Sequence, residues 1–211
     1  MSIIKFIKSL FKRSKTNQAL YEQCAYHESG HIVMAYLSKF KCDSVTIIQD
    51  GSGNGFTKFD YGKSPMTELI TSIVNFSEYP EMFNSLPPTV KIYAPDVAFK
   101  ICGVLLGGPV SEAIYKAGIE FEGNLPIEVM GPDLLRVNSI HHLLSSIDIH
   151  HKPNYIKENL HSIVNLLRQE QVWKAVDTLS KDILASSTKS LSKQEIEISL
   201  QRSGYLNFIN S

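Results

Sequence analysis

The chain has 211 residues, of which 43% are apolar, and its 21 Lys and Arg residues balance 21 Asp and Glu residues. This composition excludes a disordered chain, a collagen and a coiled coil, and a zero formal charge argues against a nucleic-acid-binding protein with a basic body. Three cysteines without a CxxC pair fit reduced thiols in the cytoplasm. No apolar run approaches the 18 or more residues that a membrane-spanning helix needs.

Residues 1–17 form a basic amphipathic segment that we expect to be distinct from a domain over 18–211. In MSIIKFIKSLFKRSK the apolar residues and the Lys and Arg residues fall on opposite arcs at helical spacing, and no acidic residue precedes Glu22. Through residues 1–15 such a helix can contact the inner face of an anionic membrane or an acidic partner. A terminal helix packed on the protein body is the alternative.

The remaining sequence predicts a mainly α-helical domain with a small β-hairpin. A helix is expected over 18–38, followed by strands over 44–49 and 56–61 around the glycine-rich turn 50–55. A capping box of Ser192 and Glu195 opens the last helix. The other predicted helices cover 67–84, 95–116 with an interruption or kink at 107–109, 133–147, 153–183 and 192–204.

His27-Glu28-Ser29-Gly30-His31 in the first helix is an HExxH sequence. Residues i and i+4 lie one turn apart on the same helix face, so both imidazoles can point at one metal ion. Glu28 emerges beside them and can reach a water without being a ligand. This spacing supplies two neutral zinc ligands and a base.

A third ligand must come from elsewhere, because no His follows at the extended metzincin spacing. Glu68 and Glu112 are candidates on later helices, and Asp133 follows a Gly-Pro turn. An Asp at that place also serves well as a helix N-cap. The residue pattern leaves these alternatives open.

Five stretches in the same order resemble the peptidase domain of FtsH-type AAA zinc metalloproteases. They are AYHESGHIVMAYL (25–37), SVTIIQDGSGNGFT (44–57), ICGVLLGGPVSEAIY (101–115), MGPDLLRV (130–137) and TLSKDILASSTKSLSKQEIEISL (178–200). The resemblance covers about residues 19–200. Pro109 stands where the family has a basic residue, and Pro132 stands where it has Asn.

The resemblance implies one Zn²⁺ ion bound by His27, His31 and Asp133, with Glu28 as the catalytic base. It gives Glu112 a supporting position beside the ligands, and Glu112 otherwise remains an alternative ligand. It also implies a helical zinc-metallopeptidase domain whose small sheet follows the HExxH helix.

The activity that follows is zinc-dependent endoproteolysis of unfolded or extended polypeptide, without ATP. We expect no nucleotide, since Gly62-Lys63-Ser64 has Thr57 where a phosphate-binding loop needs Gly. A stand-alone peptidase domain without its ATPase module would act on unstructured segments, assemble as a homo-oligomer or use a separate unfoldase partner.

An extended substrate is expected to add as a strand to an edge offered by the predicted strand over 44–49. The residues of that edge are Val45, Thr46, Ile47 and Ile48. The competing hypothesis is a weakly active or inactive zinc-binding relative that acts as a protein-binding or regulatory module. Retention of Glu28 together with both histidines favours the enzyme.

Overall fold

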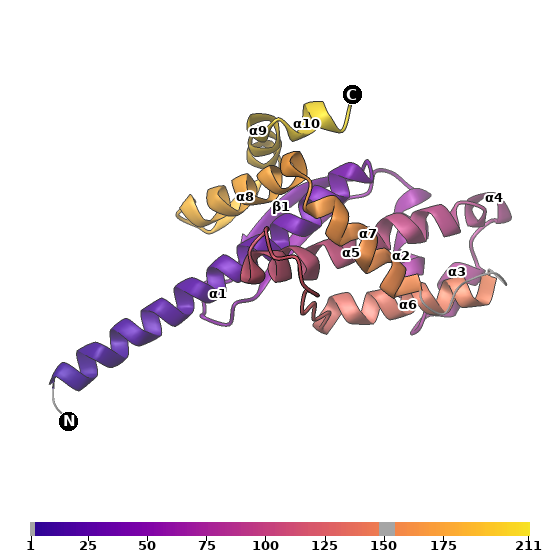
Figure 1. Ribbon diagram of the computed structural model, residues 1–211. Helices are drawn as coiled ribbons and strands as arrows, with labels where there is room; N and C mark the ends of the chain where they lie inside the picture. The colour runs from indigo at the N-terminus through magenta and orange to yellow at the C-terminus, as the bar shows by residue number, and fades with distance from the viewer. Residues whose placement is uncertain (1–2, 148–154) are drawn as a thin grey trace.

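The structure is a computed structural model that describes the backbone of residues 3–147 and 155–211 and the side chains of 17–147 and 156–211 (Figure 1). The helices are α1 (Ile3–Leu37), α2 (Met66–Val74), α3 (Pro80–Asn84), α4 (Pro88–Lys91), α5 (Ala94–Ala117), α6 (Gly131–Ile147), α7 (Tyr155–Leu167), α8 (Glu170–Ala185), α9 (Lys193–Ser203) and α10 (Tyr205–Phe208). The strands are β1 (Lys41–Ile47), β2 (Gly55–Asp60) and β3 (Ser190–Ser192). The prediction of a mainly helical fold with a small antiparallel sheet is confirmed.

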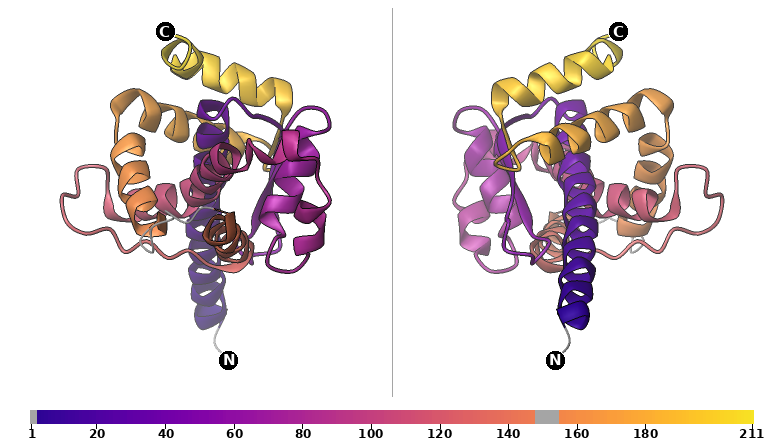
Figure 2. Two further views of the ribbon diagram at one scale, coloured as in Figure 1. Left: turned by 90° about the vertical axis from the view of Figure 1, so that its right-hand side faces the viewer. Right: turned by 90° about the vertical axis from the view of Figure 1, so that its left-hand side faces the viewer.

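α1 and α5 form the centre of the fold and cross at a point where each helix has a glycine. A Cβ added at Gly30 of α1 would lie 2.2 Å from the carbonyl oxygen of Gly107 of α5. Only glycine permits this approach of two backbones. In Figure 2 α1 lies in the middle, with the sheet and α2 on one side and α7 and α8 on the other. The crossing therefore fixes the helix turn that carries the HExxH residues.

Aromatic side chains join α8 to the same centre. The Tyr26 ring stacks on Tyr115 of α5 at 4.0 Å between ring centroids and on Trp173 of α8 at 5.7 Å. The Tyr26 hydroxyl donates a hydrogen bond of 2.7 Å to Asp177. Because Tyr26 immediately precedes His27, these contacts hold α1 in a fixed rotation about its own axis.

The sheet has the order β2-β1-β3, so β1 is its central strand. β1 pairs with β2 over residues 41–47 and with β3 through Ser44, Val45 and Thr46. The expectation that Val45, Thr46, Ile47 and Ile48 offer an open edge is therefore wrong. The three-residue strand β3 occupies that edge, and the side chains of Val45 and Ile47 are buried. Among the described residues, no strand pairs with the outer side of β2.

Two predicted helices are divided in the structure. The predicted helix over 67–84 is α2 and α3, because the chain leaves the helix before Pro80. The predicted helix over 153–183 is α7 and α8, separated at Gln169, whose backbone is extended. α7 packs on α5 whereas α8 packs on α1, so the break lets one apolar stripe cover two partners. At 107–109, where an interruption or a kink was predicted, the helix is not interrupted, and α5 runs through Pro109.

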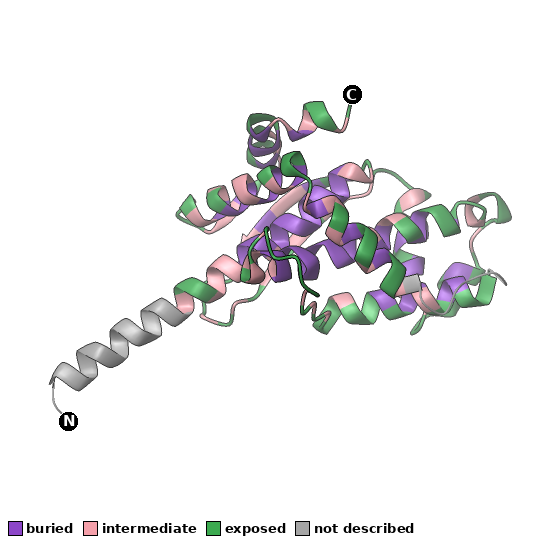
Figure 3. Ribbon diagram, viewed as in Figure 1, coloured by how far each residue is buried: buried purple, intermediate pink, exposed green. Residues whose placement is uncertain are grey.

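α5 is, among the described residues, the one helix long and apolar enough by composition to cross a membrane. From the sequence we expected no apolar run of membrane-spanning length, and that expectation did not single out α5. Within the protein, 78% of its most apolar window is buried, and Figure 3 shows the buried residues gathered where α1 and α5 lie side by side. That is the environment of a core helix.

α1 is continuous from Ile3 to Leu37, so the expected boundary between residues 17 and 18 falls inside a helix. The side chains of residues 1–16, on which the predicted basic amphipathic face depends, lie outside the described residues. At the other end of the chain, the predicted capping box of Ser192 and Glu195 is confirmed.

Candidate metal centre

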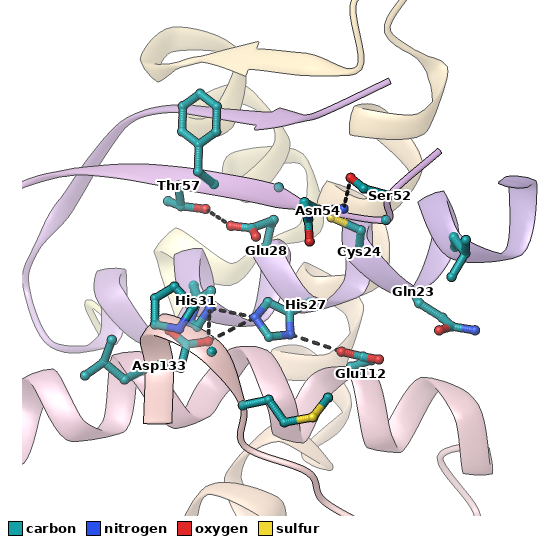
Figure 4. A pocket seen from close by; sticks show the side chains of 18 of the residues that line it. Gln23, Cys24, His27, Glu28, His31, Ser52, Asn54, Thr57, Glu112 and Asp133 are labelled. Atoms are coloured by element: carbon teal, nitrogen blue, oxygen red, sulfur yellow. Dashed lines mark hydrogen bonds and ion pairs between the residues drawn. The ribbon is translucent and has the colours of Figure 1, made fainter. Parts of the chain in front are cut away.

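The two histidines of the HExxH sequence present the same ring atom toward each other. His27 Nε2 and His31 Nε2 are 3.0 Å apart (Figure 4). His31 Nδ1 is 2.8 Å from the carbonyl oxygen of Val104, which can only accept a hydrogen bond, so Nδ1 carries the proton and Nε2 has the free lone pair. Two lone-pair nitrogens at this distance need a proton or a cation between them.

Asp133 completes the group from the first turn of α6. Its Oδ2 lies 3.2 Å from His27 Nε2 and 3.3 Å from His31 Nε2. In a tetrahedral site with metal–ligand bonds of about 2.0 Å, neighbouring ligand atoms are about 3.3 Å apart. The three donor atoms therefore have the spacing of three corners of a zinc tetrahedron, and the group could hold a metal ion.

The charges around His27 also favour a cation at this position. Burial by itself would lower the pKa of His27, but hydrogen bonds to Asp133 and Glu112 raise it to about 9. The histidines in turn hold the pKa of Asp133 well below its usual range, although burial opposes this shift. The protein stabilises a positive charge between these groups, which either a proton or a divalent cation can supply.

A glycine of α5 closes one side of this group. A Cβ added at Gly108 would lie 2.5 Å from His31 Nε2 and 2.8 Å from His27 Nε2. Such a Cβ would fill the space on which both nitrogens converge. The missing side chain at Gly108 thus leaves room for an ion, a feature that the sequence analysis did not identify.

Glu112 lies on the opposite side of the His27 ring from the donor group. Its Oε2 is 3.1 Å from His27 Nδ1, and its Oε1 accepts a 2.5 Å hydrogen bond from Lys116. A carboxylate in this position orients the ring and leaves Nε2 free to bind a metal. Of the other predicted alternatives, Glu68 lies on α2, where it accepts a hydrogen bond from Ser64 and does not line the same cavity.

Glu28 is buried between the imidazoles and the sheet, and only 5% of its surface is exposed. Its Oε2 accepts a 2.7 Å hydrogen bond from the Thr57 hydroxyl on β2 (Figure 4). A Cβ at Gly55 would lie 3.0 Å from the Glu28 side chain, so β2 packs closely on it. The partner Thr57 was not predicted, because nothing in the sequence pairs one hydroxyl with one distant carboxylate.

A cavity of about 520 Å³ joins these groups. α1, the hairpin loop and β2 form one side, and the first turns of α6 form another. Cys24 also lines it, but burial and the charges of Glu28 and Glu112 raise the pKa of this thiol to about 12, so it stays protonated. Arg136 of α6 lines the cavity as well, and the sequence analysis did not single it out. The predicted residues Val45, Thr46, Ile47 and Ile48 do not line it.

A scan of protein-family models and a search of functionally characterised proteins gave no match to this sequence.

Proposed function

We propose that this chain is a zinc-dependent endopeptidase that hydrolyses unfolded or extended polypeptide without ATP. The observation that carries the proposal is the convergence of His27 Nε2, His31 Nε2 and Asp133 Oδ2 within 3.0–3.3 Å of one another, with Glu28 in the same cavity. The resemblance of five sequence stretches to the FtsH-type peptidase domain supports the same assignment.

Zinc is the metal that this donor set favours among common biological cations. Two imidazole nitrogens and one carboxylate oxygen suit a borderline-soft ion, whereas Mg²⁺ and Ca²⁺ prefer all-oxygen sites. Three protein ligands also leave a coordination position open, as in catalytic rather than structural zinc sites. When bound, Zn²⁺ would supply a Lewis acid that polarises a carbonyl group and lowers the pKa of water.

Glu28 is the proposed base. Its carboxylate takes a proton from the attacking water and passes that proton to the amine that leaves. The hydrogen bond from Thr57 holds one carboxylate oxygen, so the other remains available for the proton. Burial of Glu28 excludes bulk water from this transfer.

The outer side of β2 is the proposed binding edge, in place of the β1 edge expected from the sequence. Gly55, Phe56, Thr57 and Phe59 of β2 line the cavity, and within the described part of the chain β2 pairs only with β1. An extended polypeptide added there would pass beside Glu28 and gain main-chain hydrogen bonds with little demand on its side chains. Backbone N-methylation of a peptide substrate near its cleaved bond should therefore weaken binding.

The proposal is tested by Glu28→Gln with casein as an unfolded substrate. Turnover should fall by about 10²- to 10⁴-fold, the usual contribution of a positioned base, while one zinc per chain is retained by metal analysis. Glu68→Gln is the matched control, because Glu68 also accepts a hydrogen bond from a hydroxyl but lies outside the cavity.

Full activity of Glu28→Gln, or purified protein that binds no zinc, would contradict the proposal. Zinc-loaded wild-type protein that binds unfolded polypeptide without cleaving it would favour the alternative, a binding or regulatory module. Cytoplasmic location, membrane contact through residues 1–15, homo-oligomerisation and a separate unfoldase remain predictions. Liposome sedimentation and light scattering would test the membrane contact and the oligomeric state.

A further inference from the structure

Arg136 is a cationic side chain in the cavity that the proposed reaction does not use. It lies on α6, one turn beyond Asp133, and it is exposed. Within residues 17–147 and 156–211, its guanidinium has no hydrogen bond or ion pair. An arginine offers five donors in a planar fork that suits a carboxylate, so this one is available to a ligand.

The carboxylates that share the cavity do not neutralise Arg136, because each has other partners. Glu28 is bonded to Thr57, Glu112 to His27 and Lys116, and Asp133 to His27 and His31. Moving any of them toward Arg136 would break a bond that positions either the proposed base or the donor group. Among the described residues, the three carboxylates that line the cavity are therefore already paired with other groups.

Arg136 lines the cavity together with Thr57 and Phe59 of β2. Thr57 beside Glu28 and Phe59 in the cavity wall lie on the same face of β2, since side chains two residues apart share a face. A polypeptide along β2 would therefore pass through the cavity that both Glu28 and Arg136 line.

We propose that Arg136 determines specificity by binding a carboxylate of the bound polypeptide. The inference rests on the proposed function and adds a substrate class to it, chains with a negative charge close to the cleaved bond. Thr57 and Phe59, which line the cavity with Arg136, are two residues apart, or about 7 Å along a strand. Since the arginine side chain is long, the carboxylate should lie about two to four residues from the bond cleaved. An internal Asp or Glu of the substrate, or the substrate's own C-terminal carboxylate, can supply this group.

The test measures binding to zinc-loaded Glu28→Gln protein, which separates recognition from turnover. Four fluorescein-labelled peptides share one sequence apart from the tested group. Three have an amidated C-terminus and carry Glu, Gln or Lys at one internal position. The fourth has no acidic residue and a free C-terminal carboxylate. The Glu peptide should bind about threefold to tenfold more tightly than the Gln peptide, in proportion to an exposed charge pair. The free C-terminus arm shows whether a terminal carboxylate serves equally. The preference for the Glu peptide over the Gln peptide should decrease in 0.5 M salt.

A second substitution assigns the effect to one side chain. Adding Arg136→Gln should make the Glu and Gln peptides equal, and Arg136→Glu should favour the Lys peptide. Arg202→Gln is the control, because Arg202 is an exposed arginine of α9 that pairs with Asp182 and lies outside the cavity. It should leave the preference unchanged.

Three results would overturn the inference. One is an unchanged Glu preference after Arg136→Gln, and another is an equal loss of binding for all peptides. Absence of measurable binding by every peptide would overturn it together with the proposed function. In contrast, a Glu preference that depends on Arg136 in a protein that never cleaves would support the binding site and contradict only the peptidase.

Discussion

The two sides of the cavity differ in how completely their polar groups are paired. On the side of α1 and α5, the histidines and Glu112 are held by one another and by the Val104 carbonyl, above a crossing of two glycines. On the side of β2 and α6, Phe56 is 53% exposed. Over residues 3–147 and 155–211 no strand pairs with the outer edge of β2, and over 17–147 and 156–211 Arg136 has no hydrogen bond or ion pair.

This difference corresponds to the two tasks that we propose. A metal ion requires donors fixed to within a few tenths of an ångström, so the side that holds it is built from packed helices. A polypeptide brings its own hydrogen-bonding groups, so the side that receives it must leave donors and acceptors free. The following predictions remove one feature at a time from the paired side.

The largest effect is expected for Gly30→Ala, which would separate the two central helices. The added methyl would meet the Gly107 carbonyl oxygen at 2.2 Å, and a backbone oxygen in a buried helix cannot move aside cheaply. We expect a loss of at least about 3 kcal/mol in the free energy of unfolding, or about 6–12 °C in Tm.

Gly103→Ala is its control, measured by the same thermal and urea unfolding. Its methyl would meet only the end of the Met34 side chain at 3.4 Å, so alanine should be neutral or slightly stabilising in this helix. Equal stability of the two variants would contradict the close crossing of α1 and α5.

Gly108→Ala should weaken zinc binding by at least about 100-fold, because its methyl would take the space between the two Nε2 atoms. The fold should survive, since the imidazole rings can turn away whereas the backbone at Gly30 cannot. Competition with a chromophoric chelator measures the affinity, and Gly103→Ala again serves as the control. Zinc affinity equal to that of the wild type would show that the ion is not bound at this position.

Glu112→Gln should reduce zinc affinity about 10- to 100-fold by removing the carboxylate that orients His27. Asp96→Asn is a closely matched control on the same helix. Asp96 also pairs with a lysine four residues later, Lys100, but it lies outside the cavity. If Asp96→Asn lost as much zinc affinity as Glu112→Gln, the loss would come from the change in net charge and not from the orientation of the His27 ring.

What the sequence predicted correctly is mostly local. The HExxH spacing lies within one helix, so the meeting of His27 and His31 follows from helix geometry. The hairpin was predicted from strands over 44–49 and 56–61 and is formed by β1 and β2, with bounds that differ by one to three residues. The capping box at Ser192 is likewise encoded by neighbouring residues.

What could not be predicted from the residues depends on distant contacts. The spacing left Glu68, Glu112 and Asp133 open as the third donor, and only the family resemblance pointed to Asp133. Strand order is set by where β3 returns to the sheet, and its three residues carry no strand signal of their own. The role of Gly108 depends on which face of α5 meets α1, which the motif in α1 does not specify.

The smallest expected effect is a difference in pH dependence between zinc-free and zinc-loaded protein. The pKa of His27 is raised to about 9 in the folded, ion-free protein, above its ordinary value of 6.5. Its contribution to stability is thus fully present below pH 6.5 and is lost as the pH rises through about 9. Zinc competes with that proton for Nε2, so zinc should stabilise the protein more as the pH rises.

The Tm of dialysed, ion-free protein should therefore fall by a few degrees between pH 6.5 and 9, relative to the zinc-loaded protein. Differential scanning fluorimetry of both forms at several pH values measures this difference, and comparing the forms cancels groups that titrate in both. In His27→Gln the two curves should run parallel, because the shared position for proton and metal is gone. Parallel curves in the wild type would mean that the proton and the ion occupy different sites, and the polar pairing around His27 would then be structural.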